Sequence, residues 1–359
     1  MLGAMDTPAL IYGANGYTGE LTARIAVEQG LRPILAGRNE TQVAAIAARL
    51  DLPYRIAMLD DAASLDAMLQ DVSVVLHCAG PFVYTAAPMV DACLRAGVHY
   101  LDITGEIAVF EALAARYNEA KRAGVMLLPG AGFDVVPSDC LAAHLKRRLP
   151  SAMRLLLGIR ALGQISRGTA MTALEGIARG EGGLVRKQGR LTSAPIAWKT
   201  RKIDFGKGPR LAVTVPWGDV STAYHSTGIP DIEVYMSFSP AAVRAMKASR
   251  YGSWLLRLPG VVGLLRRRIR SSAPGPTDAE RASGIGVLWG RAEDDAGNVV
   301  EARLRTPEGY TLTALTLLLI MRKVLAGEVK PGFQTPSSAY GPDLILEIEG
   351  VERIDLVPE

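Results

Sequence analysis

Three glycines, Gly13, Gly16 and Gly19, follow a short apolar run at a spacing of three residues. A chain that turns this tightly from a strand into a helix needs residues without a Cβ, and the missing side chains let a phosphate approach the N–H groups at the helix start. The third glycine also lets helix and strand pack closely. The spacing predicts a nucleotide phosphate site, with a glycine turn that binds nothing as the plainer alternative. The other residues that we expect at the phosphates are Asn15, Tyr17 and Thr18.

The end of the second apolar run carries a basic residue. An acidic side chain at this point, roughly 20 residues after the glycines, would bind the ribose 2′-hydroxyl of NAD. The sequence has Gly37, Arg38 and Asn39 instead, and the planar guanidinium of an arginine suits a 2′-phosphate. These residues therefore predict NADP(H) rather than NAD(H), with an ordinary solvated arginine as the alternative.

Three further strand ends are expected at the same edge of the sheet, where ligands of such folds bind. Asp60 ends the third run and could accept a hydrogen bond from the adenine amino group. HCAGPF and DITGE end the fourth and fifth runs, and a nicotinamide ribose can lie along the first of these loops. The residues expected there are Cys78, Ala79, Gly80, Pro81, Phe82, Asp102, Thr104 and Gly105. Each could instead be a turn residue or helix cap, and for Thr104 and Glu106 the two interpretations weigh equally.

Hydride chemistry needs a positioned cofactor and often a proton donor. His225 and its neighbour Tyr224 belong to a polar segment that we expect to be a loop of the second domain, where they could face the nicotinamide. Asp134 follows the sixth run and could bind substrate. The alternatives are a loop histidine and a helix cap. No CxxC or HExxH pattern occurs, so no metal site is predicted. The histidines that we expect to be structural are His77, His99 and His144.

Short apolar runs alternate with segments of helical periodicity in the first third of the chain. The helical segments are Tyr17–Glu28, Glu40–Leu50, Ala62–Leu69, Ala87–Arg95 and Ala108–Arg122. This alternation predicts an α/β fold with a doubly wound parallel sheet, a Rossmann domain, over residues 1–137. Longer strands and a hairpin around DDAGN then predict a second α/β domain with a mixed or antiparallel sheet over 138–329. It includes a long helix at Tyr310–Ala326. A return of the tail, 330–359, to the first domain is left open.

The composition excludes several classes of protein. A net charge of +4 over 359 residues is too small to indicate nucleic-acid binding. Cys78, Cys93 and Cys140 lack the even number and the spacing of a disulfide framework. Neither a basic signal-peptide start nor an apolar run of about 20 residues occurs. We therefore expect a cytoplasmic protein.

Two stretches are strongly basic. Between Arg186 and Arg210 the only acidic residue is Asp204, and further on an apolar segment precedes a cluster of arginines. The cluster consists of Arg266, Arg267, Arg268 and Arg270. Basic residues beside apolar ones can bind a membrane surface, an acyl chain or an acidic carrier protein. The alternative is a buried helix with a solvated basic end.

Several motifs together resemble one family. IYGANGYTG, LAGRN, HCAGPF, MVDACLRAGVHYLDITGE and LLPGAGFDVVPSD are similar to the saccharopine dehydrogenase-like NADP-binding proteins. RGTAMTALE, PWGDVSTAYHSTGIPDIEVY, GPTDAER and GFQTPSSAYGPDLIL resemble the subgroup of trans-acting enoyl reductases. The resemblance implies a Rossmann domain and a C-terminal α/β domain that closes over the nicotinamide and often mediates dimerisation. One departure is VYTAAP, where many relatives have a Tyr-Gly pair.

The resemblance also implies a reaction. Saccharopine dehydrogenases proper act on a C=N bond, and trans-acting enoyl reductases reduce the C=C bond of an acyl chain carried by a polyketide synthase. We therefore expect an NADPH-dependent oxidoreductase that reduces a C=C bond in a small-molecule or carrier-bound acyl substrate, and a homodimer. The alternatives are a C=N reductase of the imine or opine type, and a non-catalytic NADP-binding protein at a lipid or protein surface.

Overall fold

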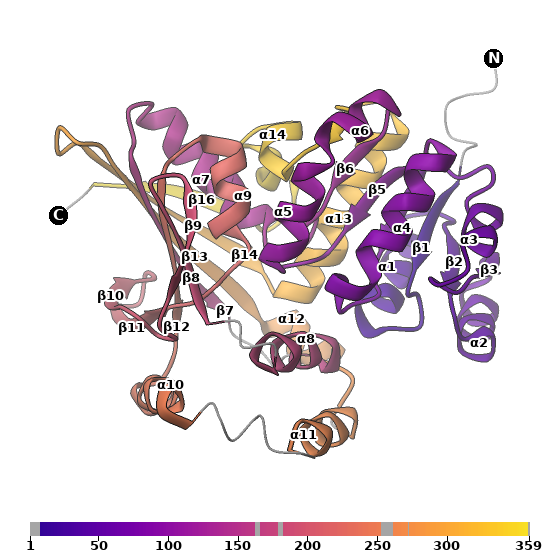
Figure 1. The fold of residues 1–359 in the computed structure, drawn as a ribbon, viewed down its shortest axis with the longest axis horizontal. Helices are drawn as coiled ribbons and strands as arrows, with labels where there is room; N and C mark the ends of the chain where they lie inside the picture. The colour runs from indigo at the N-terminus through magenta and orange to yellow at the C-terminus, as the bar shows by residue number, and fades with distance from the viewer. Residues whose placement is uncertain (1–7, 162–165, 179–181, 253–260, 272, 358–359) are drawn as a thin grey trace. The chain divides into compact units, whose positions relative to one another are not determined.

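The computed structural model describes residues 8–161, 166–178, 182–252, 261–271 and 273–357 (Figure 1). The chain divides into two compact units. Unit 1 consists of residues 1–136 and 310–339, and unit 2 of residues 137–309 and 340–359. Each unit contains its own sheet, called sheet A in unit 1 and sheet B in unit 2.

Sheet A is parallel throughout the described residues, with the strand order β3-β2-β1-β4-β5-β6-β15. Its strands are β1 (Ala9–Tyr12), β2 (Ile34–Gly37), β3 (Tyr54–Ile56), β4 (Val74–His77), β5 (His99–Asp102), β6 (Met126–Leu128) and β15 (Gly332–Phe333). Every residue of β1, β2 and β4 is buried, as expected for a parallel sheet that helices cover on both faces. The strand order reverses between β1 and β4, so the crevice for a ligand lies at the carboxyl ends of these two strands.

The helices of unit 1 lie between these strands in the sequence, except the last one, which follows β15. They are α1 (Tyr17–Glu28), α2 (Glu40–Leu50), α3 (Ala62–Met68), α4 (Phe82–Ala96), α5 (Ile107–Ala115), α6 (Tyr117–Arg122), α13 (Gly309–Leu325) and α14 (Pro336–Tyr340). Local chemistry explains several of their ends. The side chain of Asn39 caps α2, the side chain of Asp61 caps α3, and α4 stops at Gly97, which adopts the left-handed conformation.

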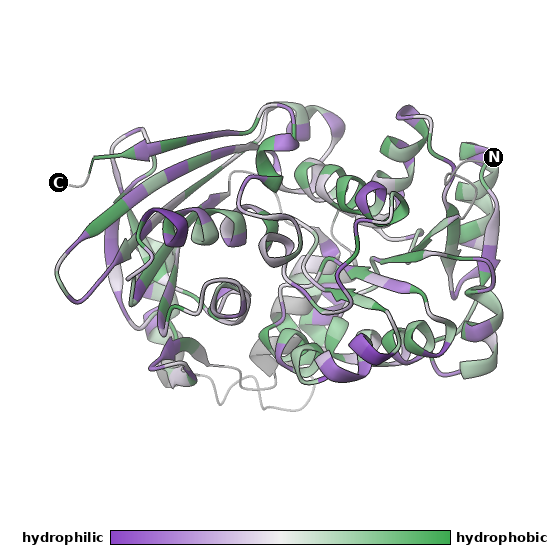
Figure 2. Ribbon diagram, turned by 90° about the horizontal axis from the view of Figure 1, so that it is seen from above, coloured by the Kyte–Doolittle hydropathy of each residue, from purple (hydrophilic) through white to green (hydrophobic). Residues whose placement is uncertain are grey.

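Sheet B is mixed, because β7 and β12 pair in parallel while its other pairs are antiparallel. Its strands are β7 (Arg154–Ala161), β8 (Gly183–Lys187), β9 (Arg190–Ala194), β10 (Thr200–Asp204), β11 (Pro209–Thr214), β12 (Asp231–Ser237), β13 (Ile285–Glu293), β14 (Val299–Pro307) and β16 (Glu352–Leu356). Apolar and polar residues alternate along its long strands (Figure 2). Gly290 lies directly against Leu141 and Leu145 of α7 (Val136–Arg148), so α7 covers the apolar face.

In its described part, unit 2 contains six further helical elements. They are α8 (Arg167–Ala178), α9 (Asp219–Thr227), α10 (Pro240–Gly252), α11 (Val261–Arg270), α12 (Asp278–Ser283) and the short 3₁₀ helix η2 (Leu344–Glu347). Among the residues that the structure describes, none of the helices combines the length and the apolar composition needed to span a bilayer.

The predicted fold class is confirmed: a doubly wound parallel sheet precedes a second domain with a mixed sheet. The units differ from the predicted domain limits at the C-terminal end. Helix α13 belongs to unit 1, because Thr313 Oγ1 accepts a hydrogen bond from the N–H of Phe133 (3.0 Å) and Thr316 Oγ1 donates one to the carbonyl of Ala131 (2.8 Å). Strand β15 joins sheet A beside β6, whereas residues 340–359 belong to unit 2.

Candidate functional site

The glycine turn after β1 has the geometry that a phosphate site requires. Gly13 adopts φ +83°, and its N–H donates to the carbonyl of Ala36 at the end of β2 (2.8 Å). A Cβ on Gly13 would lie 2.8 Å from the nitrogen of Ala79 in the loop after β4. A Cβ on Gly19 would overlap the carbonyl oxygen of Gly13. Any side chain at either position therefore moves backbone, which explains why both residues are glycine.

The N-terminus of α1 differs from those of the next two helices. Gly16 caps α1 without a side-chain hydrogen bond, whereas Asn39 Oδ1 accepts from the N–H of Gln42 in α2 (3.1 Å) and Asp61 Oδ1 accepts from Ser64 in α3 (3.1 Å). Asn15 Nδ2 in the glycine turn donates to Gln42 Oε1 (2.7 Å). The turn is thus tied to α2, and among the described residues Gly16 gives the start of α1 no side-chain cap, at a position where the helix dipole favours an anion.

The predicted adenosine end carries two opposite charges beside Tyr12. Burial raises the pKa of Tyr12, the charge of Arg38 lowers it and that of Asp60 raises it, so both charged groups lie near its hydroxyl. That hydroxyl donates to the carbonyl of Ala57 (3.0 Å). Arg38 is exposed and makes no hydrogen bond or ion pair with any residue that the structure describes. A cation at this strand end therefore remains available to a ligand.

The loop after β4 leads into a helix whose N-terminus is already occupied. Helix α4 begins at Phe82, five residues before the predicted Ala87. The carboxylate of Glu106 accepts hydrogen bonds from the N–H groups of Phe82 (2.7 Å) and Val83 (3.0 Å). Glu106 therefore caps α4 from the loop after β5. Burial raises the pKa of the Cys78 thiol to about 12, so this thiol is not a nucleophile at neutral pH.

Asp102 joins the loops after β5 and β6. Its side chain is fully buried and accepts from the hydroxyl of Tyr100 (2.8 Å) and from the N–H groups of Thr104 and Gly130 (both 2.9 Å). Thr104 Oγ1 in turn accepts from the N–H of Glu106 (3.0 Å). Burial raises the pKa of Asp102 to about 7. In this geometry Asp102 and Thr104 position the loops, and their contact with a nucleotide stays a prediction.

Asp134 is half-buried in the segment after β6, beside the loop after β5. A Cβ on Gly105 would lie 2.9 Å from Asp134 Oδ2, so the two loops are in close contact. Burial raises the pKa of Asp134 to about 6. The structure thus brings Asp134 together with Gly105, and the carboxyl is protonated in a pH range where an ordinary aspartate is ionised.

Tyr224 and His225 lie in unit 2, and the expectation of a loop there is wrong. Both belong to α9, which ends at Gly228 in the left-handed conformation. The guanidinium of Arg186 lies 4.3 Å from the centre of the Tyr224 ring, and the Tyr224 ring meets His225 edge-on at 5.9 Å. His225 is exposed. The catalytic role predicted for these two residues stays a prediction.

Sequence reasoning missed the partners that hold the site together. Tyr100 and Thr313 were not singled out, and their only sequence signal is a polar group within an apolar strand or helix. His77 is another polar side chain within an apolar strand, but it lacks a hydrogen-bond partner among the described residues, and this disfavours its charged form. Its ring is fully buried among Tyr12, Phe82 and Tyr100, neither ring nitrogen hydrogen-bonds to a described residue, and burial lowers its pKa to about 3. His77 is therefore a neutral structural residue.

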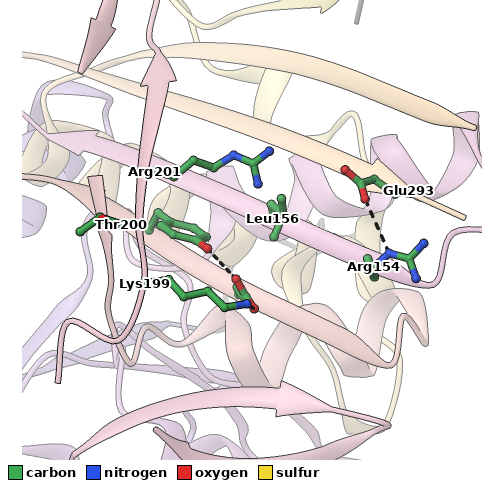
Figure 3. A pocket seen from close by; sticks show the side chains of 8 residues that line it. Arg154, Leu156, Lys199, Thr200, Arg201 and Glu293 are labelled. Carbon is green, nitrogen blue, oxygen red and sulfur yellow. Dashed lines mark hydrogen bonds and ion pairs between the residues drawn. The ribbon is translucent and has the colours of Figure 1, made fainter. Parts of the chain in front are cut away.

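A separate depression of about 540 Å³ lies on sheet B (Figure 3). Its charged residues are largely paired with each other: Lys199 with Glu233, and Arg154 with Glu293 at 3.6 Å. Its lining residues are Arg154, Leu156, Lys199, Thr200, Arg201, Glu233, Tyr235 and Glu293. Apart from Lys199, these lining residues belong to the strands β7, β10, β12 and β13 and to no helix, so we do not assign the dinucleotide to this depression. The described residues also contain no group of His, Cys, Asp and Glu that could hold a metal ion.

Comparison with known proteins agrees with this geometry. Residues 9–128 match the family model of the saccharopine dehydrogenase NADP binding domain. A trans-acting enoyl reductase of Mycobacterium leprae is 34% identical over 148 residues, which cover 39% of this chain and 35% of that protein. A saccharopine dehydrogenase-like oxidoreductase of Mus musculus is 32% identical over 150 residues, 36% of this chain and 35% of its own length. The chain thus matches about a third of the length of these relatives.

The whole fold also has a counterpart among solved structures. The apo saccharopine dehydrogenase (L-Glu forming) of Saccharomyces cerevisiae superposes with a TM-score of 0.65 over 98% of this chain and 100% of that one, at 13% identity. At this identity the likeness shows the fold alone. The glycine turn, the uncapped start of α1 and the available Arg38 fit NADP(H). Residues 9–128 thus form an NADP-binding domain of the saccharopine dehydrogenase type, whose cofactor is NADP(H).

Proposed function

We propose that the chain is an NADPH-dependent reductase that acts on the C=C bond of an acyl substrate, either a small molecule or a chain held on a carrier protein. The observation that carries this proposal is the match of 39% of the chain to relatives named trans-acting enoyl reductases, at 32–34% identity. The motifs of its second half that resemble the same subgroup support it.

Different residues of unit 1 bind different parts of the cofactor. The glycine turn and the start of α1 receive the pyrophosphate, and Arg38 receives the 2′-phosphate through charge-assisted hydrogen bonds. The loops after β4, β5 and β6 form the nicotinamide side, and the network of Asp102 and Glu106 keeps them in place. The bound cofactor supplies the hydride.

Burial raises the pKa of two carboxyls at this edge, Asp102 and Asp134. Asp102 is fully buried and accepts three hydrogen bonds, so half-buried Asp134 is the better candidate to meet a substrate. Its carboxyl has a pKa of about 6, raised by burial, so it is half protonated near that pH. Reduction of an activated C=C bond needs a proton at the carbon that does not receive the hydride, and a carboxyl of this pKa is a competent donor. We therefore assign Asp134 as the general acid of the proposed reaction.

The test measures NADPH oxidation by the full chain with an enoyl thioester, on coenzyme A and on an acyl carrier protein, and with a cyclic imine. We expect turnover of the enoyl substrates, with a kcat that falls above about pH 6 as Asp134 loses its proton. Asp134→Asn lowers kcat roughly 100-fold without changing the affinity for NADPH. Asp71→Asn, in an exposed turn of the same unit, is the matched control.

Three outcomes contradict the proposal. Oxidation with the imine alone means C=N reduction. NADPH binding without turnover of any substrate means a cofactor-binding protein without this chemistry. A pH profile of Asp134→Asn that follows that of the wild type removes Asp134 from the reaction.

A further inference from the structure

A long part of unit 2 contains no acidic residue. Between Glu233 and Asp278 the sequence has only basic charges. They are Arg244, Lys247, Arg250, Arg257, Arg266, Arg267, Arg268 and Arg270. A region of one charge sign attracts an oppositely charged partner over a distance of about one Debye length, about 8–10 Å at physiological salt.

Helix α11 presents part of this charge beside an exposed apolar side chain. Leu264 is 69% exposed, and Arg267 and Arg268 are exposed three and four residues further on, which places all three on one face of the helix. The guanidinium groups of both arginines make no hydrogen bond or ion pair with any described residue. We call this surface, Leu264 with Arg267 and Arg268, the α11 face.

The opposite side of α11 is only partly covered. The helix packs against α8 and lies beside it in Figure 1. Val262, Leu265 and Ile269 are each half-buried, and none of the described side chains of α11 is buried in a core. The helix is therefore a surface element whose apolar residues are incompletely covered, so burial in unit 2 does not account for them.

We propose that the α11 face docks on an anionic lipid surface. Arginines at the level of the headgroups bind lipid phosphates, while an apolar side chain between them enters the boundary of the acyl chains. A helix of ten residues is about 15 Å long, too short to supply by itself the roughly 800 Å² that a standard protein interface buries on each partner. A lipid surface has no fixed shape to match, so the charge and one inserted leucine suffice for reversible binding.

The test is vesicle flotation of the full chain with vesicles of phosphatidylcholine alone and of phosphatidylcholine mixed with phosphatidylglycerol. We expect binding to the anionic vesicles only, and release by salt. Arg267→Glu together with Arg268→Glu weakens binding by at least about 25-fold. Leu264→Gln weakens it by roughly fivefold, and because it changes no charge it separates insertion from attraction.

The matched control reverses two exposed basic residues at the end of another helix, Lys121→Glu with Arg122→Glu in α6, and leaves binding unchanged. NADPH affinity and the thermal midpoint, measured on every variant, report on folding. Equal binding to both kinds of vesicle, no binding of the wild type, or an equal loss in the control overturns the proposal. A carrier protein that binds through the same arginines while anionic vesicles fail also overturns it.

Discussion

The N-termini of α1 and α4 lie at the same edge of sheet A, but among the described residues a side-chain carboxylate caps only that of α4. Helix α4 receives the carboxylate of Glu106 on its first N–H groups, at 2.7 and 3.0 Å. In the part of the chain that the structure describes, the cap of α1 at Gly16 makes no side-chain hydrogen bond, and the acid of the first turn, Glu20, pairs with Arg49.

This difference shows how the fold selects a binding position. Each helix start carries a partial positive charge of about one half, and an internal carboxylate neutralises it at α4. The start of α1 has no side-chain cap at Gly16 within the described chain, so its partial charge is not neutralised in this way. We therefore expect a dinucleotide pyrophosphate to bind at the start of α1 rather than of α4, and the following predictions test that contrast.

The largest effect is expected at Gly19. An alanine there overlaps the carbonyl of Gly13, which is backbone and cannot rotate away. We expect Gly19→Ala to abolish measurable NADPH binding and to lower the free energy of unfolding by about 1–3 kcal/mol, measured by calorimetric titration and denaturation. Gly30→Asn at the other end of α1, where a side chain meets open space, leaves binding unchanged. Full binding by Gly19→Ala would separate the turn from the cofactor.

The cap of α4 depends on Asp102, because Asp102 positions the loop that carries Glu106. Its pKa is raised to about 7 in the fold from an ordinary 3.8, so the native state binds more protons than the unfolded state between these values. Stability contributed by this group is therefore lost as pH rises from about 4 to about 7, by up to roughly 4 kcal/mol. The measurement is the free energy of unfolding of wild type and of Asp102→Asn, taken by urea unfolding across this pH range. His77, whose pKa is lowered, gives the opposite pH trend in both proteins, so its contribution cancels in the difference between them. Parallel curves would contradict the assignment.

Arg38 tests the other end of the open site. Arg38→Ala removes the cation expected at the 2′-phosphate, so we expect NADPH affinity to fall roughly 100-fold, about 2.7 kcal/mol, with little change for NADH. Nicotinamide fluorescence titration measures both. Arg32→Ala is the control, because Arg32 is exposed and pairs with Asp51 nearby. An equal loss for both nucleotides would mean that Arg38 supports the fold rather than the phosphate.

The smallest effect is expected from Glu106→Gln, which keeps the shape of the cap but removes its charge. We expect a loss of about 1 kcal/mol in the free energy of unfolding, with NADPH affinity reduced only a few-fold because we place the pyrophosphate at α1. Glu40→Gln, an exposed acid in the first turn of α2, serves as the comparison. A loss of NADPH binding as large as that in Gly19→Ala would place the phosphate at α4 instead.

Features with a local cause could be predicted from the sequence. The bounds of α1 and α2 agree with the prediction, because the glycine turn and the Asn39 cap lie next to the helices that they start. The start of α4 was predicted too late, because its cap comes from Glu106, 24 residues away. The serines and threonines around His225 favour a loop by composition, yet they form α9, since helix formation there depends on packing against sheet B.

Contacts between residues far apart in the chain could not be predicted, because no local pattern indicates them. Nothing around Thr313 or Thr316 indicates that their hydroxyls bind the backbone at Phe133 and Ala131, and α13 was therefore expected in the second domain. The candidate site shows the same division. Its glycines and Arg38 can be recognised in the sequence by residue type and spacing. The roles of Asp102 and Glu106 in positioning the loops depend on which loops the fold brings together.

The late addition of α13 and β15 to unit 1 has a consequence for biosynthesis. A ribosome that has released residues 1–136 has made the NADP-binding strands β1 to β6, but the partners of Ala131 and Phe133 and the edge strand beside β6 come only after residue 309. At ordinary rates of translation the intervening stretch takes on the order of 10–30 s. During that interval the nascent domain exposes an unpaired strand edge. Chaperones or early NADPH binding can then influence whether the domain folds or aggregates.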